Sequence, residues 1–196
     1  SDLLLATNMA DGHPDARIAL ERIANKSKSM AAQIRGILNH SRAGRQVIRR
    51  KRLNLTDLVL EISPDIIRTH GNAYTKLTVQ PQMFALADET LLLCLMENLL
   101  GNAYKYASRE ARPEVSVGIA EKEGQPAYFV RDNGAGFDMD YVDKLFAPFQ
   151  RLHNIDEFPG TGIGLATIRR IISRHGGIVW AEGAQDKGAT FYFTLQ

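Results

Sequence analysis

The sequence predicts an α+β fold, namely a two-layer α/β sandwich preceded by a helical hairpin of a bundle domain. Three observations carry this prediction. Between residues 16 and 48, apolar residues recur three and four positions apart, as they do in packed helices. Beyond residue 53, helix-like and strand-like segments follow one another without strict βαβ alternation, which favours a layered α+β domain. The pattern changes between residues 50 and 54, so we divide the chain into domains 1–52 and 53–196.

The first domain has the pattern of two helices joined by a turn. Residues 1–11 resemble the end of a helix, and Gly12 and Pro14 mark the turn that follows. Serines interrupt the apolar seam of the second helix, so we expect the hairpin to need partner helices from an upstream segment or a second subunit. Because the chain begins at Ser1 rather than at a methionine, we expect a piece of a longer protein. The seam comprises Leu20, Ile23, Ser27, Met30, Ile34, Ile37 and Ser41.

Charge and composition exclude several classes of function. With 24 basic and 22 acidic residues the net charge is +2, which is too balanced for non-specific nucleic-acid binding. No apolar run approaches the roughly 20 residues that a membrane-spanning helix needs, although the parent protein could be membrane-anchored or soluble. The single cysteine, Cys94, lies in an apolar run and is expected to be a small hydrophobe in a reducing, cytoplasmic compartment. Basic residues crowd positions 42–52, which fits either a solvated helix end or a docking site for an acidic partner.

Periodicity and turn residues predict the elements of the second domain. A short extended segment leads into a helix that Thr56 caps and that Pro64 either bends or splits. Asp88 caps a long helix that ends near residue 106. We expect strands at 75–80, 84–87, 115–120, 127–131, 177–180 and 190–195, and further helices at 141–145 and 164–175.

The long helix carries the first polar cluster, in the segment ENLLGNAYKY. Asn98 and Asn102 are four residues apart and share one face, and Lys105 follows on the same side. Amide oxygens can complete the coordination shell of Mg²⁺, and a lysine neutralises phosphate charge, so this face suits a metal-bridged polyphosphate. The alternative is a surface helix on which polar residues happen to align.

The second cluster is DNGAG, at the end of a predicted strand. The carboxylate of Asp132 is well placed to accept a hydrogen bond from an exocyclic amino group such as that of adenine. Guanine offers an acceptor at that position and would be rejected. Glycines at 134 and 136 let the backbone approach a flat ring. A plain hairpin turn would have the same composition.

The third cluster is GTGIG, directly before a helix of apolar period. Glycines that lead into a helix N-terminus offer backbone amides and a positive dipole to phosphates. No strand comes directly before the cluster, so it does not fit the dinucleotide-binding fingerprint. It also lacks the Lys-Ser/Thr pair of a P-loop.

Together, these clusters resemble the ATP-binding domain of sensor histidine kinases, in the superfamily shared with DNA gyrase. The matching boxes are NLLGNAYKY, DNGAGF, LFAPFQRL and GTGIGLA, and the resemblance covers about residues 53–196. The preceding helix, which ends in ILNHSR, is similar to the second helix of the family's dimerisation and phosphotransfer domain. The segment RLHNIDEFPGTGIGL resembles the lid of phytochrome-type kinases. The resemblance implies a Bergerat ATP-binding fold with ATP and Mg²⁺ as cofactors.

The resemblance also implies roles for individual residues. Asn102, helped by Asn98, would coordinate Mg²⁺, and Lys105 would contact phosphate. Tyr106 would pack on adenine, whose amino group Asp132 would bind. Gly134 and Gly136 would shape the adenine pocket, and Thr190 would support Asp132. Arg151 would contact phosphate, and Phe146 and Phe149 would either anchor the lid or fill the core. The polyphosphate would be held by Gly160, Thr161, Gly162, Gly164 and the Leu165 amide.

One position separates the subclasses of the superfamily. Relatives that hydrolyse ATP place a water-activating glutamate where this chain has Asn98. Glu97 is one residue earlier, about 100° around the helix, and is expected to point elsewhere. Without a base aimed at water, phosphoryl transfer relies on positioning an external nucleophile, which favours a kinase over a hydrolase.

The family's phosphoacceptor motif has no match in the chain. None of the five histidines has the required context, and we expect each to be structural or exposed: His13, His40, His70, His153 and His175. We therefore expect the acceptor histidine to lie upstream, so that this fragment binds ATP but does not phosphorylate itself.

The resemblance implies the catalytic core of a histidine kinase, which transfers the γ-phosphoryl group to a histidine and thence to a response-regulator receiver domain. The full-length protein is expected to form a homodimer through the helical hairpin, with no nucleic-acid partner. The rival hypothesis is a nucleotide-binding pseudokinase or scaffold that signals by conformation alone. A serine-directed kinase of the same superfamily is a third possibility, against which the bundle-type helix argues.

Overall fold

The computed structural model describes residues 47–196 apart from 71, 73, 123, 153–157 and 159, together with the isolated positions 20, 23 and 27. Leu20, Ile23 and Ser27 are helical and exposed. The remainder of the predicted hairpin, with His13 and His40, lies outside the described residues, as does His153 of the predicted lid. The division of the chain at residue 52 therefore stays a prediction.

A five-stranded sheet forms one layer of the described fold. Its strand order is β2-β4-β5-β7-β6, and all neighbours are antiparallel except β2 and β4, which run parallel. A separate two-stranded sheet pairs β1 with β3. The strands are β1 (Lys51–Asn54), β2 (Lys76–Val79), β3 (Phe84–Ala87), β4 (Glu114–Lys122), β5 (Gln125–Asp132), β6 (Val179–Gly183) and β7 (Ala189–Phe193).

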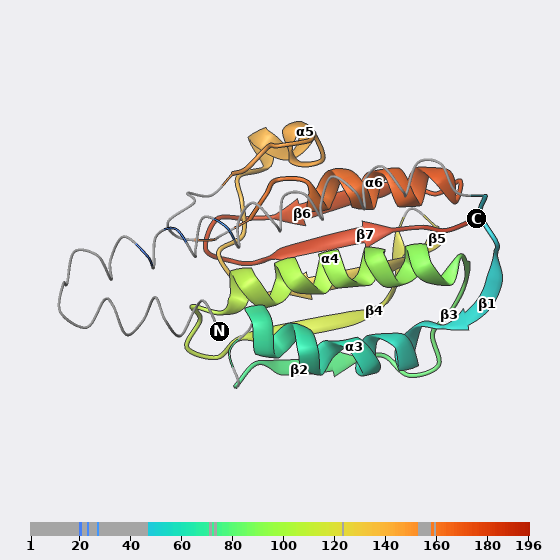
Figure 1. The fold of residues 1–196 in the computed structure, drawn as a ribbon, viewed down its shortest axis with the longest axis horizontal. Coiled ribbons are helices and arrows are strands. Elements are labelled where there is room, and N and C mark those ends of the chain that lie inside the picture. Colours follow the sequence, from blue (N-terminus) through green and yellow to red (C-terminus); the bar gives the residue numbers. More distant parts are fainter. Residues whose placement is uncertain are drawn as a thin grey trace.

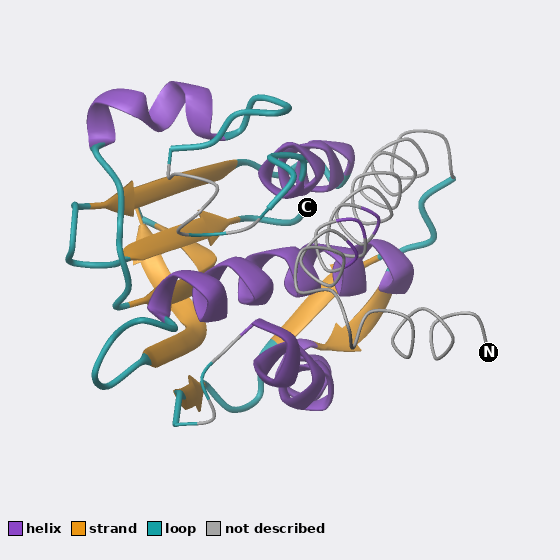
Figure 2. Cartoon of the chain, turned by 60° about the vertical axis from the view of Figure 1, so that its left-hand side comes forward, coloured by secondary structure: helices purple, strands orange, loops and turns teal. Residues whose placement is uncertain are grey.

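Helices form the other layer and confirm the predicted two-layer sandwich. The helix α4 lies between α3 and α6 in both views of the chain (Figures 1 and 2). A short 3₁₀ turn and α5 lie beyond the end of β5 (Figure 1). The helices are α3 (Leu55–His70), α4 (Glu89–Ala107), the 3₁₀ turn (Met139–Tyr141), α5 (Val142–Leu145) and α6 (Gly164–Arg174).

The helix α4 is the centre of the core. Leu92, Leu95 and Leu99 are fully buried between the sheet and the neighbouring helices, so one side of α4 is committed to packing. Its N-cap is Asp88, as predicted, whose carboxylate accepts a hydrogen bond from the Leu91 amide at 3.2 Å. The Asp88 amide donates in turn to Nε2 of His175, which is fully buried at the end of α6. This bond fastens the beginning of α4 to the end of α6.

The beginning of α3 differs from the prediction. Asn54 caps the helix, since its side-chain oxygen accepts from the Asp57 amide at 3.2 Å. Thr56, the predicted cap, lies inside the first turn and is buried. Its hydroxyl donates to the Gln80 carbonyl and accepts from the Met83 amide, so it satisfies the loop between β2 and β3. Pro64 neither ends nor splits the helix, which is continuous from residue 55 to residue 70.

The closing hairpin is shifted toward its turn, and the turn is tighter than predicted. The strands were expected at 177–180 and 190–195, but β6 continues to Gly183, which pairs with Ala189 of β7. Small residues near the turn hide this pairing, because glycine and alanine have low strand propensity and the register is set by the partner strand. The parallel pairing of β2 with β4 was likewise not anticipated. It requires a crossover connection, which α4 supplies.

Candidate nucleotide-binding site

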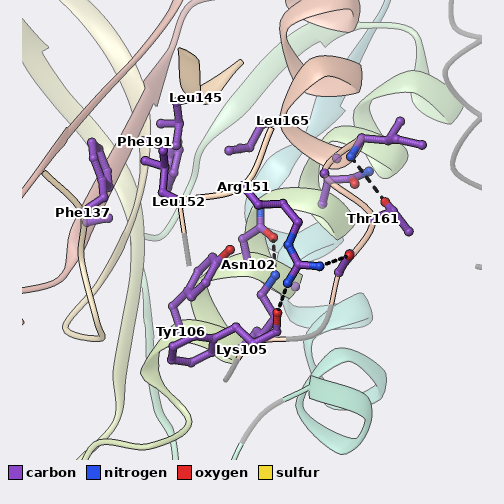
Figure 3. Close-up of a pocket in the computed structure, with 18 of the residues that line it drawn as sticks. Asn102, Lys105, Tyr106, Phe137, Leu145, Arg151, Leu152, Thr161, Leu165 and Phe191 are labelled. Atoms are coloured by element: carbon purple, nitrogen blue, oxygen red, sulfur yellow. Dashed lines mark hydrogen bonds between the residues drawn. The ribbon is translucent and has the colours of Figure 1, made fainter. Parts of the chain in front are cut away.

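A cavity of about 470 Å³ opens between α4, the end of β5 and the loop that leads into α6. It gathers all the predicted cofactor-binding residues except Gly134 and Thr190. Apolar side chains, among them Phe137, Leu145 and Phe191, collect at one end, and polar side chains collect at the other (Figure 3). The predicted residues that line it are Asn98, Asn102, Lys105, Tyr106, Asp132, Gly136, Arg151, Gly160, Thr161, Gly162, Gly164 and Leu165.

The two asparagines of α4 line the cavity together. The amide nitrogen of Asn98 donates to the Cys94 carbonyl at 2.7 Å, within its own helix. Its oxygen is thereby left facing the start of α6, where a Cβ atom on Gly164 would lie 2.8 Å from Asn98 Oδ1. The oxygen of Asn102 accepts from Lys105 Nζ at 3.3 Å. Both side chains thus present oxygens, the atoms that a hard cation prefers.

Lys105 is a half-buried cation without a carboxylate partner among the described residues. Burial, and then the charge of Arg151, lower the pKa of Lys105 to about 8. Its Nζ lies 4.3 Å from the centroid of the Tyr106 ring, over the ring face. Two positive groups held close together are stabilised by a bound anion, so this part of the cavity is suited to phosphate.

Asp132, the last residue of β5, provides a buried carboxylate at the other end. Its side chain is 4% exposed and accepts hydrogen bonds from the backbone amides of Gly134 (3.0 Å) and Ala189. Burial outweighs these two bonds and raises the pKa of Asp132 to about 7. A ligand amino group that donates to this carboxylate would relieve that cost.

The two glycines after Asp132 have different positions. Gly134 does not line the cavity. It lies against the end of α4, where a Cβ atom would overlap the carbonyl of Tyr106. It allows the DNG turn to pack on α4. Gly136 lines the cavity with φ of +60°, a left-handed conformation that favours glycine.

The glycine-rich loop brings backbone groups to the cavity. Gly162 has φ of +72°, and its carbonyl accepts from the Phe149 amide at 2.9 Å. Gly164 is the first residue of α6, so the amides of Gly164 and Leu165 belong to the first turn, where no intrahelical acceptor exists. An anion at this helix start would meet free N–H groups and the positive end of the dipole.

Arg151 joins the two sides of the loop. Its guanidinium donates to the Gly160 carbonyl at 2.9 Å and to the Phe158 carbonyl at 2.6 Å (Figure 3). The Phe158 ring lies 5.0 Å from the Tyr106 ring, between centroids. In this structure Arg151 therefore shapes the loop above α4, and its position over the cavity also leaves it close to where phosphate would lie.

Thr190 departs from its expected role, and of the two phenylalanines Phe146 fits the core-filling alternative. Thr190 does not line the cavity: its hydroxyl accepts from Arg131 Nε at 3.1 Å, and its strand neighbour Ala189 supports Asp132 instead. Alternate residues of a strand face opposite sides of the sheet, which explains the difference. Phe146 is buried against Phe191, whereas Phe149 is 68% exposed and so does not fill the core.

Two ionisable residues of the cavity wall were not predicted from the sequence. Glu97, expected to point elsewhere, lines the cavity beside Asn98. His70, the last residue of α3, lines it as well. His70 comes close to Gly101 of α4, where a Cβ atom would lie 3.7 Å from His70 Cδ2. No pattern in the sequence indicates that the end of α3 comes to this place.

The residues that form the cavity belong to a segment that matches a known protein family. Residues 87–196 match the model of the family described as "Histidine kinase-, DNA gyrase B-, and HSP90-like ATPase", and these residues include every predicted cofactor-binding residue. The chain belongs to this ATPase family. The matched residues belong to an ATP-binding catalytic domain of the kind found in sensor histidine kinases. The resemblance inferred from the four boxes is thereby confirmed.

Relatives of known name support the same conclusion. The chain is 44% identical to cyanobacterial phytochrome A of Nostoc over 119 residues, which are 61% of this chain and 15% of that protein. It is 32% identical over 110 residues to the sensor histidine kinase WalK of Bacillus subtilis, covering 55% of this chain and 18% of WalK. The chain thus spans less than a fifth of the length of either relative.

Solved structures of histidine kinases share the fold. The mycobacterial sensor histidine kinase MprB superposes with a TM-score of 0.61 at 22% identity, covering 74% of this chain and 97% of that one. The full-length ShkA structure in complex with AMPPNP gives 0.65 at 23% identity, covering 91% of this chain and 38% of ShkA. Among the described residues of our chain, no helix is long and apolar enough to cross a membrane.

Proposed function

We propose that the chain binds ATP with Mg²⁺ and serves as the catalytic domain of a sensor histidine kinase, which transfers the γ-phosphoryl group to a histidine. A response-regulator receiver domain is the proposed final acceptor. The observation that supports this proposal best is the polarity of the cavity. A buried carboxylate among apolar side chains lies at one end, and amide oxygens, a lysine and a helix N-terminus lie at the other.

The residues present suit a magnesium ion held mainly by the nucleotide. Among the described residues, no three histidine, cysteine or acidic side chains come together as a metal site. The oxygens of Asn98 and Asn102 would hold the ion jointly with phosphate oxygens, an arrangement that Mg²⁺ favours. When bound, the ion neutralises charge that develops on the transferred phosphoryl group.

The base and the phosphates would be held at opposite ends. Asp132 would accept the adenine amino group, while Tyr106 and Gly136 would shape the pocket around the ring. Lys105, Arg151 and the backbone of Gly160, Thr161, Gly162, Gly164 and Leu165 would bind the polyphosphate. The chain thereby orients the terminal phosphoryl group toward an incoming nucleophile, and this positioning is the main contribution that a protein makes to phosphoryl transfer.

The nucleophile is proposed to come from outside the described residues. His175 is fully buried and bonded to Asp88 and Ile171, so its ring cannot meet a phosphoryl group. His70 lies in the wall of the cavity beside Lys105, where it would meet the nucleotide of its own domain rather than serve as acceptor. We infer that an upstream bundle helix supplies the histidine and that the hairpin mediates homodimer formation in the parent protein.

Calorimetric titration with ADP and a non-hydrolysable ATP analogue, with and without Mg²⁺, tests the nucleotide site. We expect Mg²⁺-dependent binding in the unmodified chain and its loss in Asp132→Asn. Asp140→Asn makes the same chemical change at an exposed position outside the cavity, so it should bind like the unmodified chain. Absence of binding in the unmodified chain would leave only a scaffold function.

The kinase step is tested in the parent protein. Incubation with ATP should give a phosphorylated product that is labile in acid and stable in alkali, as phosphohistidine is. A product with the opposite stability would indicate a hydroxyl acceptor. Binding of ATP without any phosphorylated product would favour the pseudokinase alternative.

A further inference from the structure

We propose that His70 binds the terminal phosphoryl group of the bound nucleotide and lets the site distinguish ATP from ADP. This inference rests on the proposed function, because it assigns a part of the nucleotide to a wall of the same cavity. Its basis is the position of an imidazole beside the polar face of α4, for which the described part of the chain supplies no hydrogen-bond partner.

The place of His70 follows from how α3 packs on α4. Val59, Ser63 and Ile66 on one side of α3 are buried, so the direction of the helix is fixed by the core. His70 is its last residue. A Cβ atom on Gly101 would lie 3.7 Å from His70 Cδ2, which is an ordinary van der Waals distance. The imidazole therefore lies against the bare backbone of α4, and a long side chain at position 101 would fill the space that the ring occupies.

The order of residues along α4 matches the order of groups along a nucleotide. The base end is marked by Tyr106, whose carbonyl accepts from the amide of Ala135 in the turn after Asp132. Lys105, Asn102 and Asn98 follow in the direction of the helix N-terminus. Gly101 lies five residues before Tyr106, which is about 7.5 Å along the axis at 1.5 Å per residue. A residue at the level of Gly101 is thus closer to the distal phosphates than to the base.

The opposite wall already supplies donors, but the α3 side has few. Across the cavity lie the glycine-rich loop, the first turn of α6 and Arg151. On the near side α3 ends, and the end of a helix exposes carbonyl groups rather than N–H groups. Glu97 in this part of the wall carries a carboxylate. Among the described residues of α3, His70 is the one that lines the cavity, so its imidazole adds a donor for a phosphoryl oxygen beside Lys105.

The electrostatic surroundings suit this role. Burial, and then the positive charge of Lys105, lower the pKa of His70 below its usual value of 6.5. In the absence of nucleotide the ring is thus neutral at pH 7, and one of its nitrogens carries a hydrogen to donate. Within the described part of the chain, neither ring nitrogen is already bonded, so a phosphoryl oxygen displaces no internal partner.

The test compares ADP with a β,γ-imido ATP analogue, both with Mg²⁺, by calorimetric titration of the 196-residue chain. We expect His70→Ala to weaken the analogue about three- to tenfold, the worth of one partly exposed hydrogen bond to phosphate. The ADP affinity should change less than about twofold, because ADP lacks the phosphoryl group concerned. His70→Gln keeps a donor and should retain part of the preference for the analogue.

A matched control and a measurement without substitution complete the design. Thr69→Ala changes the neighbouring exposed residue of α3, outside the cavity, and should leave both affinities unchanged. In the unmodified chain, the ring nitrogen resonances of His70 should shift on binding of the analogue and not on binding of ADP. This readout applies even where a His70 variant fails to fold.

The outcomes separate this inference from the proposed function. Equal weakening of both nucleotides in His70→Ala, unchanged affinities for both, or unshifted ring resonances would each overturn the role of His70 while leaving the nucleotide site in place. If the unmodified chain bound neither nucleotide, the proposed function would fail, and the inference with it.

Discussion

Gly164, the first residue of α6, faces Asn98 of α4 so closely that a Cβ atom at position 164 would lie 2.8 Å from Asn98 Oδ1. The start of α6 and the polar face of α4 therefore form the two sides of one narrow site. Helix propensity does not explain a glycine at this position. The absence of a side chain lets the two helices approach each other at the place where a phosphate would be held.

The first prediction concerns this approach. Gly164→Ala should displace the Asn98 side chain or shift α6, and we expect nucleotide affinity to fall about tenfold, measured by calorimetry with Mg²⁺. Gly160→Ala is the comparison within the same loop. Its Cβ atom would lie 3.4 Å from the flexible end of Lys105, so the loss should be smaller. Equal losses in the two variants would show that the Asn98 contact is not the cause.

The second prediction concerns selection of the base. Asp132→Asn should weaken ADP binding about a hundredfold, because an amide in place of the carboxylate loses a charge-assisted hydrogen bond in a buried place. The preference for ADP over GDP should fall as well, since an amide can donate to the guanine carbonyl. Competition of the two nucleotides against a fluorescent adenine nucleotide measures this ratio. An unchanged ratio would place the base elsewhere in the cavity.

The third prediction concerns the pH dependence of binding. Burial raises the pKa of Asp132 to about 7, and a donated amino group favours the ionised carboxylate. ADP affinity should therefore fall as pH decreases below 7, by about tenfold at one unit below that value. In Asp132→Asn this dependence should vanish. A profile that is flat between pH 5.5 and 7.5 in the unmodified chain would contradict the assignment.

The fourth prediction is the effect of the same group on stability without ligand. The folded-state pKa of Asp132 is raised from its ordinary value of 3.8 to about 7. Its contribution is thus fully present below pH 3.8 and is lost as pH rises through 7. The Asp132→Asn variant has no carboxylate to ionise, so its stability should not fall in this way. The free energy of unfolding of the variant minus that of the unmodified chain should therefore increase from pH 4 to pH 7.5. Urea unfolding across this range measures the difference, with Asp140→Asn as control.

The fifth prediction concerns the bond between α4 and α6. His175→Ala removes a fully buried ring that accepts from the Asp88 amide at 3.1 Å and donates to the Ile171 carbonyl at 2.8 Å. The Asp88 amide loses its acceptor, whereas the Ile171 carbonyl keeps its bond from the backbone amide of residue 175. Loss of packing and this one unpaired amide should cost about 2–4 kcal/mol, observed as a lower midpoint of urea unfolding. Arg169→Ala, an exposed change on the same helix, should cost less than about 0.5 kcal/mol.

Much of the site could be predicted because its residues are related by local geometry. The period of an α-helix places Asn98, Asn102 and Lys105 on one side wherever the helix lies. A glycine-rich segment before a helix presents free amides in any context, which holds for Gly160 to Gly164. The cap at Asp88 and the buried strand that ends at Asp132 likewise depend on short segments of chain.

The remainder depends on contacts between distant segments. Thr190 could be assigned to a strand, but only its register with Arg131 decides that it faces away from the cavity. Thr56 and Asn54 are both acceptable caps, and the loop between β2 and β3 selects Asn54 by claiming the Thr56 hydroxyl. Where two residues could each cap a helix, the hydrogen-bond partners that they meet in the folded chain decide which of them does.

By itself, the sequence determined the layered α+β class and the order of the motifs, because both are encoded in short-range periodicity and spacing. The family followed from the resemblance of those motifs to a known family. Tertiary structure alone decided that Glu97 and His70 line the cavity. Glu97 was expected to point elsewhere than Asn98, but the cavity extends far enough around α4 to include it. His70 comes to Gly101 because the buried side of α3 fixes where that helix ends. Such a position is a property of packing between elements, and the local pattern of neither helix contains it.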